Sequence, residues 1–209
     1  MDSSLLSTQA TIVVVMSAFS LVAICVPLFR GLTLAARAYK ATRFVPRPAL
    51  EKSLQFATKG PADSIAVLML RVLAKSLRSP DARAVASDFV VDASKQYVMN
   101  EYEATYARPM SMYSNLLPPV GLAGNAVGML ILLVSKHMAG TPLELGALGL
   151  ALSSTIFALL GYALVEAIKL RLYGRMLRCL NEVVSLHRTA EERAEKTGGA
   201  HGAAIASPA

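Results

Sequence analysis

The sequence contains no tryptophan, only two cysteines and only three histidines. Cys25 and Cys179 lie in segments of different character, so they offer neither a disulfide framework nor a metal-binding pair. His137, His187 and His201 have no spacing typical of metal ligands. We therefore expect no enzymatic active site, no cofactor and no metal.

Charge is absent from three long stretches of the chain. The segments 10–29 and 116–135 contain no charged residue, and the segment 145–168 contains only Glu166. Roughly 20 helical residues cross the hydrocarbon core of a bilayer, and each segment reaches that length. A buried helix of a soluble protein rarely lacks charge over such a length, so the sequence predicts three transmembrane helices.

Cationic residues are absent before the first apolar segment. No lysine or arginine precedes Arg30, whereas thirteen lie in 30–115, Lys136 stands alone between the second and third segments, and seven follow Ile168. Lysine and arginine near span ends remain in the cytoplasm, which predicts an outside N-terminus and a cytoplasmic C-terminus. The net charge of +7 then needs no nucleic acid, because topology and anionic lipid headgroups of the bilayer explain it. The acidic leader and the long first run predict a membrane anchor rather than a cleaved signal peptide.

These observations predict an all-α membrane protein with three transmembrane helices and long helical cytoplasmic extensions. The expected order is an outside N-terminus (1–9), a transmembrane helix (10–29), a cytoplasmic helical region (30–115), a second transmembrane helix (116–135), an outside loop (136–144), a third transmembrane helix (145–168) and a cytoplasmic C-terminal helix with a disordered tail (169–209). The tail is expected from 198 onward, where glycine and alanine predominate.

Two helices are expected within the cytoplasmic region. Apolar residues at helical spacing between Ile65 and Leu77 predict a short amphipathic helix, which Ser79-Pro80-Asp81 ends. From there to Asn115 no glycine appears, which predicts one long helix that continues into the second span. An apolar stripe along it predicts packing between subunits, and therefore a homo-oligomer. The stripe consists of Val85, Phe89, Ala93, Val98, Tyr102 and Tyr106.

The second apolar segment combines paired prolines, three glycines and one amide. Gly124 and Gly128 form a small-xxx-small pair, which lets another helix approach closely. Asn125 is the strongly polar side chain in the body of this segment, and such groups usually face a protein interior or a watery pathway. Asn125 is thus either an interhelical hydrogen-bonding group or a pathway residue. The residues expected at helix contacts are Pro118, Pro119, Gly121, Gly124 and Gly128.

The third apolar segment has one polar line. At about 100° per residue, Glu144, Tyr162 and Glu166 each lie within about 20° of Thr155 around the helix axis. A helix that is polar along one line and apolar elsewhere suits a pore lining. Alternatives remain open: Glu166 is an interfacial carboxylate that pairs with Lys169 or extends towards the headgroups, and the hydroxyls of Ser153 and Ser154 bond only to the backbone of their own helix. The candidate ion-pathway residues are Asn125, Ser154, Thr155, Tyr162 and Glu166.

Two motifs resemble those of the MotA/TolQ/ExbB proton-channel family. The run PPVGLAGNAVG, from Pro118 to Gly128, is similar to the family's second-span pattern P-x-x-G-L-x-G-T-x-x-G. The run ALSSTIFALLGYAL, from Ala151 to Leu164, is similar to its last-span pattern, A-L-x-x-T followed by a glycine-containing apolar helix. The resemblance covers about residues 80–175. With three spans rather than four, the chain looks more like the TolQ/ExbB branch than the flagellar branch.

The resemblance implies a homopentamer in a bacterial inner membrane, surrounding a dimer of single-span partners of the ExbD/TolR/MotB type. In such a complex an aspartate of the partner carries protons through the pore, and their flow drives rotation of one ring within the other. Thr155 matches the pore threonine of the last span. Asn125 stands where the family usually has a threonine, Ala158 where a glycine is common, and Leu150 where some relatives carry an acid.

The residues themselves agree on one point. Glu166 lies about 16 Å along the helix axis from Thr155, towards the cytoplasm, so this chain has no ionisable residue at mid-membrane depth. A proton relay needs a titratable group there, which another chain must supply. Two other functions remain open: a non-conducting scaffold of the same architecture, and the membrane subunit of a transporter.

Overall fold

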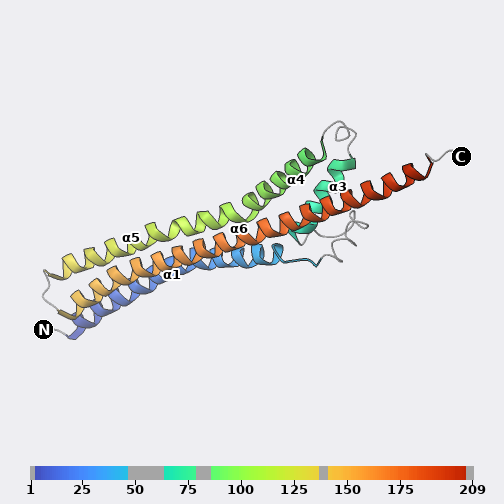
Figure 1. Ribbon diagram of the computed structural model, residues 1–209. Coiled ribbons are helices and arrows are strands. Elements are labelled where there is room, and N and C mark those ends of the chain that lie inside the picture. Colours follow the sequence, from blue (N-terminus) through green and yellow to red (C-terminus); the bar gives the residue numbers. More distant parts are fainter. Residues whose placement is uncertain (1–2, 47–63, 79–85, 137–140, 206–209) are drawn as a thin grey trace. The chain divides into compact units, whose positions relative to one another are not determined.

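All regular elements in the described part of the chain are helices. The computed structural model describes residues 3–46, 64–78, 86–136 and 141–205. The α-helices are α1 (Ser3–Ala41), α3 (Ile65–Arg78), α4 (Ser87–Tyr102), α5 (Arg108–Lys136) and α6 (Thr141–Ile205), and a π-helical turn, η2 (Glu103–Ala107), joins α4 to α5 (Figure 1). The all-helical prediction is confirmed.

Three helices are long and apolar enough to cross a membrane. The candidate spans lie within Val14–Ala41, Ser87–Leu133 and Glu144–Glu192. The first two contain most of the predicted segments 10–29 and 116–135, and the third contains all of 145–168, which supports a multi-pass membrane protein. Helical residues run continuously from Ser87 to Lys136 through α4, η2 and α5, as the sequence predicts, and the predicted start of this helix at Pro80-Asp81 lies outside the described residues.

The π-helical turn marks the one irregularity in that long helix. Pro109, two residues beyond η2, has no N–H to donate to the preceding turn, and its ring crowds the carbonyl four residues earlier. The wider π turn accommodates both effects, because it shifts the hydrogen bonding by one residue. The sequence predicts the long helix but not this turn.

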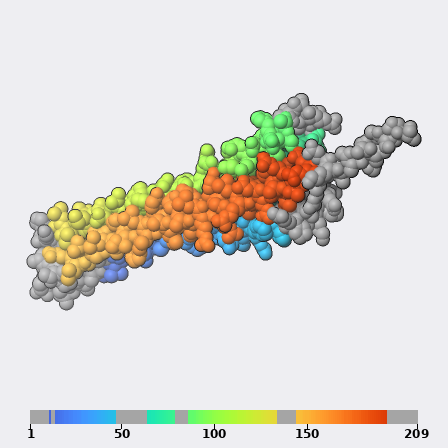
Figure 2. Space-filling model, in the orientation of Figure 1, coloured from blue at the N-terminus to red at the C-terminus, as the bar shows by residue number. Residues whose placement is uncertain are grey.

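The chain divides into two compact units. The first, called here the three-helix unit, comprises Met1–Arg37 and Ala104–Arg171, and the second unit comprises Ala38–Glu103 and Leu172–Ala209. In the three-helix unit, α1, α5 and α6 run side by side (Figure 1), and the side chains of α5 and α6 meet along their length (Figure 2).

Small residues fill the inside of the three-helix unit and large ones cover its outside. Gly121, Gly124, Gly128, Ala151 and Ala158 are buried. Phe19 is 73% exposed, Phe29 68%, and Leu130 and Leu160 61% each; a soluble monomer rarely exposes so much apolar surface. Lipid chains are as apolar as leucine, so helices in a bilayer associate through close packing of small residues, and this arrangement fits a membrane environment.

The second unit buries one side of the predicted amphipathic helix. Leu73 of α3 packs in a cluster with Val90 and Val91 of α4, against which Val184 of α6 also lies. The short helix is confirmed, although its last predicted apolar residue, Leu77, is 40% exposed.

The apolar stripe predicted on the long helix is only partly buried within the chain. Val98 and Tyr102 are buried, whereas Phe89 and Ala93 are exposed, since α4 turns Val90, Val91 and Ser94 inward instead. Val85 lies outside the described residues. The stripe's predicted role in packing between subunits stays a prediction.

The C-terminal end differs from the expected disordered tail. Helix α6 continues through Ile205, so residues 198–205 are helical, and only 206–209 lie outside the described residues. The alanines of this stretch favour a helix, and they follow a charged run with high helix propensity, which together outweigh its glycines.

We expect Gly128→Ala to destabilise the three-helix unit while Gly149→Ala does not. A Cβ atom on Gly128 would lie 2.8 Å from the Ala147 carbonyl oxygen and the Ala151 backbone nitrogen, neither of which moves easily, whereas a Cβ on Gly149 meets nothing within 4 Å. Overpacking of this kind costs about 1–3 kcal/mol. Gly149→Ala should be neutral or stabilise by up to about 1 kcal/mol, because alanine favours the helix.

Reversible unfolding of both variants in mixed micelles measures the difference in the free energy of unfolding. Equal stability of the two variants would contradict the close contact between α5 and α6.

Candidate functional site

Two hydroxyls of α6 reach across to one carbonyl of α5. The Ser154 hydroxyl donates to the Gly121 carbonyl oxygen at 3.3 Å and the Thr155 hydroxyl approaches the same oxygen at 3.5 Å. Each hydroxyl also lies near the Ala151 carbonyl of its own helix, at 3.1 and 3.3 Å respectively. Gly121 permits this because it has no side chain, and a Cβ there would lie 2.5 Å from the Ala158 Cβ.

The two hydroxyls differ in burial. Ser154 is buried, whereas Thr155 is half-buried and its contacts lie at the long limit of hydrogen bonding. The Thr155 hydroxyl lies 3.3 Å from the Ala151 carbonyl oxygen and 3.5 Å from that of Gly121, slightly longer contacts than those of Ser154. Such a hydroxyl can donate to a carboxylate or accept from a carboxylic acid.

Asn125 is half-buried on α5. Its amide forms no hydrogen bond with any of the described residues. The amide is also not among the fully buried polar groups that lack a hydrogen-bond partner. An amide without a partner on an apolar helix is expensive in a bilayer. The structure brings Gly121, Ser154 and Thr155 together but records no contact between Asn125 and Thr155.

Tyr162 and the two prolines occupy ordinary packing positions. The Tyr162 ring packs against the cluster of Ile24, Leu117 and Ala158, which joins α1, α5 and α6. Pro118 is half-buried and Pro119 is exposed, both within the continuous helix α5. The predicted polar line of α6 therefore lies next to α5, because Thr155 contacts Gly121 and Tyr162 packs beside Leu117.

Glu166 forms an ion pair within the chain. Its Oε2 lies 2.6 Å from Lys169 Nζ, and its Oε1 accepts hydrogen bonds from Lys169 Nζ and from Ser114 Oγ, both at 2.8 Å. Lys169 also donates to Ser111 Oγ at 3.0 Å. The structure therefore matches the alternative in which the Glu166 carboxylate pairs with Lys169 rather than standing free.

Sequence reasoning missed the hydroxyls that complete these contacts. Ser111 and Ser114 stand three residues apart on α5, a spacing that places both on one face of a helix, and that spacing was the available signal. Ser20 of α1 lies beside Gly124 and Ser154, and no pattern in the first apolar segment marked it.

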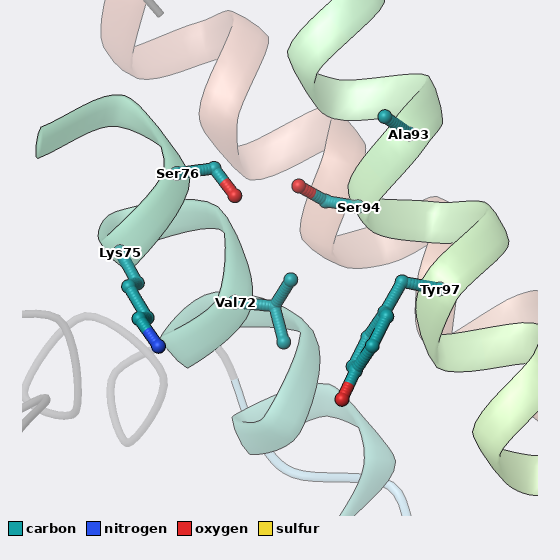
Figure 3. Close-up of a pocket in the computed structure, with 6 residues that line it drawn as sticks. All are labelled: Val72, Lys75, Ser76, Ala93, Ser94 and Tyr97. Atoms are coloured by element: carbon teal, nitrogen blue, oxygen red, sulfur yellow. The ribbon is translucent and has the colours of Figure 1, made fainter. Parts of the chain in front are cut away.

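The second unit contains a groove between α3 and α4 of about 470 Å³. Val72, Lys75 and Ser76 line it from α3, and Ala93, Ser94 and Tyr97 from α4; the Ser76 and Ser94 hydroxyls point towards each other (Figure 3). None of the predicted site residues lies in this groove. Within the described residues no group of three or more His, Cys, Asp or Glu side chains could hold a metal ion.

Comparison with protein families, curated proteins and solved structures finds no match to this chain. A functional assignment therefore depends on the two motifs and on the contacts described above. Those contacts divide the candidate residues into two groups. Ser154 and Glu166 form hydrogen bonds inside the chain, and the Tyr162 side chain packs there without a recorded hydrogen bond. The Thr155 hydroxyl has two longer contacts, and the Asn125 amide has no hydrogen-bond partner among the described residues.

We expect Glu166→Gln to destabilise the chain more than the double variant Glu166→Gln/Lys169→Met. The single change leaves the positively charged ammonium of Lys169, whose side chain is 25% exposed, with only neutral hydrogen-bond partners. The expected loss is about 1–3 kcal/mol, between that of an exposed pair and that of a buried one. Removing both charges removes the unpaired cation, so the double variant should recover part of the loss in a micelle unfolding assay. An unfolding free energy unchanged by Glu166→Gln would show that the pair contributes nothing.

Proposed function

We propose that the chain is a ring subunit of a proton-motive-force-driven, energy-transducing channel in a bacterial inner membrane. It works with a single-span partner of the ExbD/TolR type, which supplies the titratable aspartate. Five copies surround a dimer of that partner. The two motifs support this function, and the state of the polar groups in the spans supports it independently.

The observation that carries the proposal is the contrast between Glu166 and the pair Thr155 and Asn125. The carboxylate of Glu166 is paired with Lys169 and Ser114, so it does not serve as a free proton carrier. Thr155 presents a half-buried hydroxyl with two long contacts, and Asn125 presents an amide without a hydrogen-bond partner among the described residues. Uncharged groups of this kind solvate a proton carrier that another chain brings to them.

Exposed apolar residues of α4 support assembly into a ring. Phe89 is 66% exposed and Tyr97 56% exposed, at positions where α4 is not buried within the chain. Large apolar side chains that stay exposed outside the apolar spans are candidates for contacts between subunits. The predicted packing between subunits implies that a second copy of the chain covers these residues.

A non-conducting scaffold is the second candidate. Asn125 stands where the family usually has a threonine. This favours the scaffold, because the larger amide side chain would narrow a pore. A transporter subunit is less well supported, since the sequence lacks the internal repeat common in carriers.

We expect Thr155→Val to abolish most proton flux while leaving assembly intact. Valine keeps the shape of threonine and removes the hydroxyl, and the two lost contacts, at 3.5 and 3.3 Å, are long enough to contribute little to stability. Asn125→Thr, which keeps a hydrogen-bonding group, is the matched comparison and should conduct. The measurement is dye-reported proton uptake by vesicles holding the complex purified from its native membrane with its single-span partner.

Full flux in Thr155→Val, at equal protein and equal oligomeric state, would remove Thr155 from the pathway. Complexes that contain no single-span protein and conduct nothing would favour the scaffold.

The orientation yields a separate expectation. In a variant without its native cysteines, Glu144→Cys should react with an impermeant maleimide added to intact cells, because 136–144 is expected outside. Gln96→Cys on the exposed side of α4 should react only after permeabilisation, because the thirteen cationic residues of 30–115 hold that region in the cytoplasm. Labelling of Gln96→Cys in intact cells would reverse the topology.

A further inference from the structure

The groove between α3 and α4 contains a hydroxyl that the chain leaves without a partner. Ser94 is only 3% exposed, yet its hydroxyl forms no hydrogen bond with any described residue. The Oγ atom is not among the fully buried polar atoms, and it points across the groove towards the Ser76 hydroxyl (Figure 3). Serine hydroxyls in helices commonly donate to a carbonyl of the preceding turn, as that of Ser114 does. The Ser94 hydroxyl is therefore available to a group that enters the groove.

The charge that borders this groove is positive. Of the described residues that line it, only Lys75 is charged, and its exposed side chain forms no ion pair with any described residue. Helix α3 as a whole contains three cations, Arg71, Lys75 and Arg78, and no acid. Ammonium and hydroxyl groups both donate to carboxylate oxygens. Val72 and the ring of Tyr97 supply apolar surface in the same groove. The groove therefore suits an acidic side chain that stands next to an apolar one.

The outward side of α4 carries this combination. Phe89 is 66% exposed, and Asp92 is exposed and forms no ion pair with any described residue. The two residues are three positions apart, so they are neighbours on the helix surface. Asp92 and Ser94 differ by about 200° around the helix axis, so the Asp92 carboxylate points away from the groove of its own chain. Asp92 can therefore reach such a groove only on another copy.

We propose that the groove between α3 and α4 of one copy receives Phe89 and Asp92 of the neighbouring copy. The Asp92 carboxylate pairs with Lys75 and accepts a hydrogen bond from Ser94, while the Phe89 ring packs against Tyr97. The groove and the Phe89–Asp92 surface are different surfaces of one chain, so the contact is heterologous, and such contacts generate rings when the rotation closes. The inference rests on the proposed function, whose ring supplies the neighbouring copy.

Cross-linking between two differently substituted copies tests the contact. In a variant without its native cysteines, copies with Lys75→Cys are produced together with copies with Asp92→Cys, so that a bond between the two positions joins separate chains. A short bifunctional maleimide should give a covalent dimer when both variants are present, and none when either is produced alone. Arg178→Cys in place of Lys75→Cys is the matched control, because Arg178 is exposed on α6 and does not line the groove.

Charge reversal tests the ion pair. Lys75→Glu and Asp92→Lys each place like charges at the contact, so each should weaken the association of purified copies in detergent micelles by about tenfold or more. The double variant restores opposite charges and should recover most of the affinity. Arg178→Glu makes the same change in net charge as Lys75→Glu outside the groove, and it should leave the association unchanged.

Ser94→Ala separates association from folding. The Ser94 hydroxyl has no partner among the described residues, so its removal should not lower the free energy of unfolding of the dissociated chain. Association should nevertheless weaken several-fold, because the carboxylate of the neighbouring copy loses a donor. Unchanged association of Ser94→Ala would remove Ser94 from the contact.

An oligomeric preparation without the expected cross-link would overturn the contact and leave the ring intact. A double charge reversal that associates no better than the single ones would overturn the contact in the same way. A chain that is monomeric in both detergent and lipid would instead overturn the ring, and with it both the proposed function and the contact.

Discussion

The close approach of α5 to α6 is the constraint on which the rest of the three-helix unit depends. Gly121, Gly124 and Gly128 recur at intervals of three and four residues, and each would bring a Cβ atom within 2.8 Å of an atom of α6. This spacing keeps one face of α5 free of side chains. Because small residues occupy the inside, the large apolar side chains cover the outside, where lipid solvates them.

The same approach explains why the polar groups of the spans cluster where they do. Only when the backbones are this close can a short hydroxyl such as that of Ser154 reach a carbonyl of the neighbouring helix. The longer side chains need no such proximity, and Glu166 with Lys169 forms its network farther along the helix pair, where Ser111 and Ser114 face α6. Close packing and interhelical hydrogen bonding thus occur along the same contact between α5 and α6, rather than around each helix.

Patterns of composition predicted the helices, and they could not predict the partners of side chains. Three charge-free runs, a proline break and an uninterrupted stretch before the second run determined where helices lie. The partner of Glu166 remained open, because the sequence allows both a free carboxylate and a pair with Lys169, and only the position of Ser114 on α5 distinguishes them. Ser20 could not be recognised at all, since a serine in an apolar run is ordinarily bonded to its own helix. The burial of Val90 rather than Phe89 depends on the packing of α3, which no single helix pattern contains.

The polar groups of the three-helix unit differ in how firmly the chain holds them. A carboxylate paired with a lysine and a serine changes its protonation state only at the expense of those contacts, so Glu166 is suited to fixing α5 against α6. The Thr155 hydroxyl has only long contacts, at 3.3 Å to the Ala151 carbonyl oxygen and 3.5 Å to that of Gly121. Among these polar groups, the Glu166 network therefore does more than Thr155 to fix α5 against α6.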